Sequence, residues 1–151
     1  MFHLVLVHPE IPHNTGSAGR LALATGATLH LVRPFGFELD DKHLRRAGLD
    51  YWHEVEVRTW DSLEELQAAA GPAARFWWCS TKARRSLWQA DFQTGDYLVF
   101  GAETRGLAES LVAAAGDHAI HIPMRPDATR SLNLATAVAI VLYEAVRQIN
   151  S

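Results

Sequence analysis

Leu98-Val-Phe-Gly-Ala-Glu-Thr-Arg-Gly-Leu107 joins an apolar run of strand length to a polar loop that two glycines bracket. The apolar residues are typical of a strand buried on both faces of a parallel sheet. In α/β sheets the ligand crevice lies at the carboxyl ends of the strands, which is where this loop begins. Gly101 and Gly106 around Glu103 indicate a backbone folded tightly, and the second glycine is expected to open a helix.

Working outward, strands are predicted at residues 3–8, 28–33, 75–80, 96–101 and 119–123. Helical patterns lie between them at residues 14–25, 61–70 and 131–148. Gly26 is expected to cap the first helix at its C-terminus, and Asp61 with Glu64 to form a capping box at the start of the second. The alternation of strands and helices predicts an α/β fold with a mostly parallel sheet.

The composition fits one ordinary domain, residues 1–151, with 48% hydrophobic and 21% charged residues. A formal charge of −3 gives no overall nucleic-acid signature, so RNA binding would need a local basic patch. The lone Cys79 can form neither an internal disulfide nor a zinc site, which favours a cytoplasmic protein without metal. The N-terminal apolar run is too short to span a membrane.

Several common motifs are missing from the sequence. It has no G-x-G-x-x-G fingerprint and no G-x-S-x-G elbow, and Leu107 stands where a phosphate-binding loop has its lysine. Dehydrogenase and serine hydrolase activities are therefore disfavoured. His118 and His121 are three residues apart near a strand, a poor spacing for chelation, so they are expected to be surface or hydrogen-bonded histidines.

Two further loops follow predicted strands. In the first, Asn14 suits a helix N-cap, Gly16 and Gly19 allow close approach, and Arg20 lies about one and a half turns into the helix. A capped helix with a surface arginine would explain this loop equally well. In the second, both Ser131 and Asn133 favour a helix start, where one such residue suffices. Three loops of this kind at strand ends favour a binding site.

The last helix is apolar around much of its circumference. One stripe contains Ala135, Val138, Leu142, Ala145 and Ile149, and a second contains Leu134, Ala137 and Val141. Such a helix is either central in the core or shared with a partner chain. In a domain of this size we expect a homodimer.

Together the three loops resemble the three motifs of the SPOUT RNA methyltransferases, in the branch that methylates ribose 2′-oxygens. More narrowly, the chain is similar to the tRNA (cytidine/uridine-34)-2′-O-methyltransferases. The similarity lies in Pro9-Glu-Ile-Pro12, Asn14-Thr-Gly16, Pro34-Phe-Gly-Phe37, Asp41-Lys42 and Arg45-Arg-Ala-Gly-Leu-Asp-Tyr51. Ser17, Gly19 and Ala102 depart from the usual pattern, and they affect packing more than chemistry.

This resemblance implies a sheet with helices on both faces, a C-terminal trefoil knot and an obligate homodimer. It implies transfer of a methyl group from S-adenosylmethionine (SAM) to the 2′-hydroxyl of the wobble nucleotide, cytidine or uridine 34, of tRNA, with leucine tRNAs favoured. Two alternatives stay open. One is 2′-O-methylation of ribosomal RNA or of another tRNA position, and the other is a non-catalytic RNA-binding dimer on the same fold.

The resemblance also implies site residues. SAM would be bound by Cys79, Thr81, Gly101, Glu103, Gly106, Leu107, Ile122, Met124, Ser131 and Leu132. Arg20 and Asn14 would act at the reacting end, shaped by Glu103 and Asn133, and tRNA would contact Lys42, Arg45, Arg46, Tyr51 and Arg130. Since arginine has a pKa above about 12 and is a poor base, Arg20 is expected to orient a phosphate or stabilise a developing alkoxide. Glu103 is expected to fix backbone amides or pair with an arginine.

Overall fold

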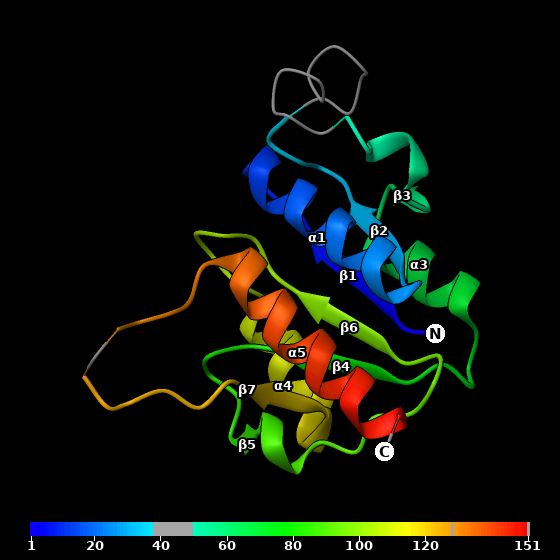
Figure 1. The fold of residues 1–151 in the computed structure, drawn as a ribbon. Helices are drawn as coiled ribbons and strands as arrows, with labels where there is room; N and C mark the ends of the chain where they lie inside the picture. Colours follow the sequence, from blue (N-terminus) through cyan, green and yellow to red (C-terminus); the bar gives the residue numbers. More distant parts are fainter. Residues whose placement is uncertain (38–49, 128, 151) are drawn as a thin grey trace.

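A computed structural model of the chain describes residues 1–37, 50–127 and 129–150. Within these residues a seven-stranded sheet has the order β3-β2-β1-β6-β4-β7-β5, and every neighbouring pair is parallel (Figure 1). The predicted α/β fold with a parallel sheet is therefore confirmed. The strands are β1 (His3–Val7), β2 (Thr28–Val32), β3 (Val57–Trp60), β4 (Phe76–Cys79), β5 (Arg85–Ser86), β6 (Tyr97–Phe100) and β7 (Ala119–His121).

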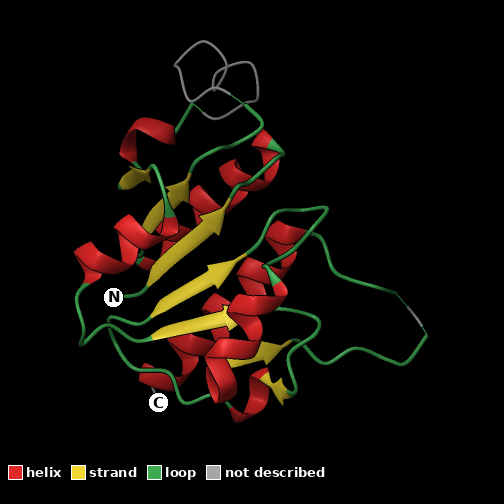
Figure 2. Cartoon of the chain, turned by 180° about the vertical axis from the view of Figure 1, so that it is seen from behind, coloured by secondary structure: helices red, strands yellow, loops and turns green. Residues whose placement is uncertain are grey.

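Helices cover both faces of this sheet (Figures 1 and 2). Helices α1 (Pro12–Thr25) and α5 (Leu134–Ile149) pack on one face, and α3 (Leu63–Ala70) and α4 (Glu109–Ala115) on the other. Strand β1 supplies both cores by alternation, because Leu4 and Leu6 face α1 and α5 whereas Val5 and Val7 face α3 and α4. Burial of the central strands on both faces explains their uninterrupted apolar sequences.

The sequence patterns missed two strands, β3 and β5, and misplaced the start of α4. Strand β3 lies at one edge of the sheet and is largely exposed, so it lacks the apolar run of a central strand. Strand β5 has two residues at the opposite edge, too few for a pattern. Gly106 does not open a helix directly, because α4 begins at Glu109 after Ala108.

Predictions of helix ends were only partly right. Gly26 ends α1 in the left-handed conformation with φ 77°, as expected. Asn14 is not the N-cap, because α1 already begins at Pro12. The second helix is capped by Ser62 and not by Asp61, with the Ser62 side chain accepting from Glu65 N. The last helix starts at Leu134, where the Asn133 side chain accepts from Thr136 N and Ser131 remains in the loop.

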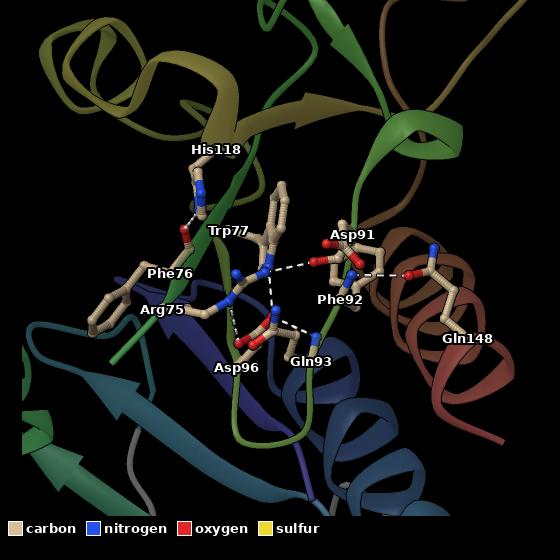
Figure 3. A network of polar contacts seen from close by, with 9 residues as sticks. All are labelled: Arg75, Phe76, Trp77, Asp91, Phe92, Gln93, Asp96, His118 and Gln148. Atoms are coloured by element: carbon tan, nitrogen blue, oxygen red, sulfur yellow. Dashed lines mark hydrogen bonds and ion pairs between the residues drawn. The ribbon is translucent and has the colours of Figure 1, made fainter. Parts of the chain in front are cut away.

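A buried carboxylate fixes the entry to β6. Asp96, only 2% exposed, accepts hydrogen bonds from Arg75 Nε at 3.0 Å, Trp77 Nε1 at 2.8 Å and Gln93 N at 2.8 Å (Figure 3). These donors come from β4 and its approach, and from the turn before β6. The network therefore ties the start of β6 to the start of β4, and the parallel pairing of the two strands places Phe100 beside Cys79 at their carboxyl ends.

Trp77 and Trp78 are buried, at 1% and 7% exposure. The ring of His118 stacks on Trp77 with centroids 4.3 Å apart, and its Nδ1 lies 3.1 Å from Phe76 O (Figure 3). His118 is thus the hydrogen-bonded histidine that was expected.

Candidate active site

A cavity of about 560 Å³ lies at the carboxyl ends of β4, β6 and β7. Strand register brings these ends together, since Cys79 pairs with Phe100 on β6 and with Ile120 on β7. All ten residues predicted to bind SAM line this one cavity: Cys79, Thr81, Gly101, Glu103, Gly106, Leu107, Ile122, Met124, Ser131 and Leu132. Residues from four separate segments of the chain therefore converge on one space.

The loop after β6 is folded tightly on itself, as its glycines indicated. Gly106 N donates to Ala102 O at 2.8 Å, and Gly106 has a positive φ of 66°. A Cβ on Gly101 would overlap the backbone of Gly106 and Leu107, so only glycine fits there. The absence of a side chain at Gly101 thus lets the backbone at Gly106 and Leu107 pack directly against it.

Glu103 fixes backbone amides, one of the two roles expected for it. Its carboxylate accepts from the backbone N–H groups of Glu10 and Ile11, both at 2.8 Å, and from Asn14 Nδ2 at 3.2 Å. With its oxygens engaged by three donors just before and within α1, Glu103 is a structural carboxylate at the site. The Asn14 side chain, 6% exposed, is held toward it.

Arg20 lies on the exposed surface of α1, outside the cavity walls. Its guanidinium carbon is 4.8 Å from the centre of the Tyr51 ring, and Tyr51 donates its hydroxyl hydrogen to Gly16 O at 2.6 Å. Burial raises the pKa of Tyr51. The half-buried tyrosine therefore bridges α1 at two points and restrains Arg20 through a cation–π contact.

The remaining predicted residues fall into three groups. Arg130 lines the cavity, whereas Asn14 and Asn133 do not. Lys42, Arg45 and Arg46 lie outside the described residues.

Sequence reasoning missed several cavity residues. Lys82 lines the cavity, and its position just after the end of β4 could have indicated this. Its Nζ lies 2.6 Å from Glu109 Oε1. Leu134, Ala137 and Val141 reach the cavity from α5, where the apolar pattern showed only that they would be buried or shared with a partner. His121 also lines the cavity, and its buried Nδ1 has no hydrogen-bond partner among the described residues.

The cavity is lined by three cationic side chains, one carboxylate and a neutral thiol. Lys82, Arg105 and Arg130 are its cationic lining residues, and Glu103 its carboxylate. Burial raises the pKa of Cys79 far above the ordinary value of a thiol, so the sulfur is a neutral packing group. Among the described residues no group of metal-ligating side chains is found, and no helix has the length and hydropathy to cross a membrane.

Relatives match this chain over almost its full length. The tRNA (cytidine(34)-2′-O)-methyltransferase of Burkholderia pseudomallei is 48% identical over 150 residues, covering 98% of this chain and 96% of its own. The enzyme of the same name from Saccharophagus degradans is 48% identical over 153 residues, covering 99% and 96%.

Solved structures agree with the fold. One, described as giving structural insights into the 2-OH methylation of C/U34 on tRNA, superimposes with a TM-score of 0.92 at 48% identity, covering 99% of this chain and 97% of that one. The SpoU methyltransferase AviRb from Streptomyces viridochromogenes in complex with AdoMet gives 0.82 at 28% identity, covering 99% and 58%. The model of the SpoU rRNA Methylase family matches residues 1–143. The chain belongs to the SpoU rRNA Methylase family.

Proposed function

We propose that this protein transfers a methyl group from SAM to the ribose 2′-hydroxyl of nucleotide 34 of tRNA. One structural observation carries the proposal: the ten residues predicted to bind SAM line a single cavity at the carboxyl ends of β4, β6 and β7. The full-length relatives that bear the name tRNA (cytidine(34)-2′-O)-methyltransferase support the choice of substrate.

The residues present fit SAM. A volume of about 560 Å³ is within the range of small-molecule sites. Leu87, Ile122 and Leu132 offer apolar walls to an adenine ring, and the loop of residues 101–107 that lines the cavity can offer backbone groups for hydrogen bonds. Bound SAM would supply an electrophilic methyl group on a sulfonium. The role of the protein would then be to hold the ribose 2′-oxygen about 3 Å from that methyl group, in line with the bond between the sulfur and the methyl carbon.

Arg20 and Asn14 are proposed to act on the RNA side. Arg20 stays protonated and can bind a phosphate beside the reacting ribose or stabilise the alkoxide that develops on the 2′-oxygen. Asn14 is held by Glu103, which can fix it relative to the loop that lines the cavity. Asn133 is proposed to shape the site from the start of α5, whose N-cap it forms. The substrate's own phosphate is a candidate acceptor for the hydroxyl proton.

We also propose that the protein works as a homodimer, with α1 and α5 at the interface. The two helices lie side by side on one face (Figure 1), and they leave Leu23 and Tyr143 at 40% and 48% exposure. We propose that tRNA contacts Lys42, Arg45, Arg46, Tyr51 and Arg130. The proposal has four further parts: a single catalytic domain over residues 1–151, a trefoil knot, leucine tRNAs as substrates and a cytoplasmic location.

The test is to incubate the protein with methyl-labelled SAM and unmodified total tRNA, then digest the RNA and identify the labelled nucleoside. We expect 2′-O-methylated cytidine or uridine from position 34, lost in Arg20→Ala. Label in ribosomal RNA or at another tRNA position would instead support the rival methyltransferase functions. A protein that binds RNA but leaves both RNAs unlabelled would be a non-catalytic dimer on this fold, and the proposal would be wrong.

A further inference from the structure

Two carboxylates join the segment before α1 to the loop after β6. Glu10 Oε1 accepts from Thr104 N at 2.9 Å and from Thr104 Oγ1 at 2.8 Å. In return, the Glu103 carboxylate accepts from the backbone N–H groups of Glu10 and Ile11. We call these four hydrogen bonds the Glu10–Glu103 clasp. It joins segments that are more than 90 residues apart in sequence.

The clasp lies where three parts of the candidate site meet. Glu103 and Thr104 line the cavity, and Asn14 of α1 donates to Glu103. On the other side, Gly36 N donates to Pro9 O at 3.0 Å, and a Cβ on Gly36 would come within 3.1 Å of Glu10 O. The segment 9–11 therefore contacts the cavity loop, the start of α1 and the loop after β2.

Glu10 is the member of the clasp that has no other task in the site. Glu10 does not line the cavity. The two hydrogen bonds that its carboxylate accepts both come from Thr104, which does line the cavity. The Thr104 donors hold the pKa of Glu10 below its usual value, because they stabilise its ionised carboxylate. A charged acceptor forms stronger hydrogen bonds than a neutral one.

We propose that Glu10 is a positioning residue for the methyl transfer: through Thr104 it fixes the cavity loop, and so sets SAM affinity and the placement of Asn14. The inference rests on the proposed function only in naming SAM as the ligand of the cavity. Glu10 itself does not touch the ligand.

The test is a calorimetric titration of the protein with SAM in the absence of RNA. Glu10→Ala should weaken SAM binding about tenfold or more, because two hydrogen bonds to a charged acceptor are lost. Glu10→Gln keeps an acceptor oxygen for the Thr104 donors and should recover most of the affinity. Glu64→Ala, at an exposed position of α3 on the other face of the sheet, is the matched control and should bind as the wild type does.

A double-mutant cycle separates positioning from simple stabilisation. If Glu10 acts through Thr104, then Thr104→Val weakens SAM binding in the wild-type background and adds little in the Glu10→Ala background. A purely structural Glu10 would lower the melting temperature while leaving the affinity of the folded protein unchanged. A folded Glu10→Ala protein that binds SAM within about twofold of the wild type would overturn the inference.

Two further outcomes keep the test decisive. If Glu10→Ala does not fold, the SAM affinities of Thr104→Val and Thr104→Ser are compared instead. Thr104→Ser keeps the hydroxyl that donates to Glu10 and Thr104→Val removes it, so equal SAM affinities of the two variants would count against the clasp. Normal SAM binding by the wild type without methylation of tRNA would refute the proposed function alone, because the titration contains no RNA.

Discussion

The guanidinium of Arg20 lies over the ring of Tyr51, 4.8 Å from its centre, while the Tyr51 hydroxyl is bonded to Gly16 one helical turn earlier. The two contacts restrain a long side chain that would otherwise move freely on the surface of α1. The family resemblance implies that Tyr51 contacts tRNA. Its observed contacts suggest a second task, the orientation of the arginine proposed to act on the substrate.

Substitution of Tyr51 should therefore reduce methyl transfer in two steps. Tyr51→Phe keeps the ring under Arg20 and should lower kcat/KM for tRNA by only about twofold to fivefold, since one hydrogen bond is lost. Tyr51→Ala also removes the cation–π contact and should lower it by about tenfold or more. SAM affinity, measured by titration, should stay unchanged in both. Equal activity of the Phe and Ala variants would show that the ring does not position Arg20.

Asp96 should matter for stability and not for ligand binding. Asp96→Ala leaves the donors of Arg75, Trp77 and Gln93 without their buried acceptor (Figure 3). We expect the free energy of unfolding, measured by urea titration, to fall by ~2–4 kcal/mol. Asp91→Ala is the control, because Asp91 contributes its backbone oxygen to the network and its side chain is exposed. A loss below about 0.5 kcal/mol would contradict this account of Asp96.

The central sheet could be predicted from sequence because β1, β2, β4, β6 and β7 are short and largely apolar. That pattern follows directly from burial, whereas the edge strand β3 is exposed and has no such pattern. Convergence of the three loops was also predictable, since parallel strands place their carboxyl ends at one edge. The family resemblance then named which residues of the loops after β6 and β7 would line the cavity, whereas the loop after β1 supplies none of its lining.

The parts that could not be predicted depend on contacts between distant segments. The side chain of Asn14 is typical of a helix cap, yet Glu103, 89 residues away, binds it inside a helix that starts earlier. Glu10 and Thr104 likewise carry no local signal of their contact. Only the fold shows that Lys82 pairs with Glu109 beside the cavity.

A pair of histidines should make the protein sensitive to acid. Trp60 Nε1 donates to His30 Nδ1 at 3.0 Å, so the His30 proton sits on Nε2, which lies 2.9 Å from His3 Nδ1. Burial, followed by the nearby His3, lowers the pKa of His30 to about 3. Below pH ~6.5 the unfolded chain binds a proton at this histidine that the folded chain does not, so stability falls as the pH drops from ~6.5 toward ~3.

His30→Gln should make this pH dependence shallower. We compare the two proteins between pH ~6.5 and ~5, where carboxylates contribute little. For each pH unit of acidification, the free energy of unfolding of the wild type should fall by up to ~1.4 kcal/mol more than that of His30→Gln. Urea titrations at several pH values measure the slope. His53→Gln, at an exposed histidine, is the matched control. The same slope in wild type and His30→Gln would show that His30 does not carry the effect.

The proposed dimer interface predicts that a charge on α5 will separate the protomers. Tyr143 is 48% exposed on α5, and Tyr143→Asp would bury a carboxylate between two apolar helix faces if α1 and α5 meet a second copy. We expect light scattering after gel filtration to change from a dimer to a monomer. Ala113→Asp adds the same charge to an exposed position of α4 on the opposite face and should stay dimeric. If Tyr143→Asp also stays dimeric, the interface lies elsewhere.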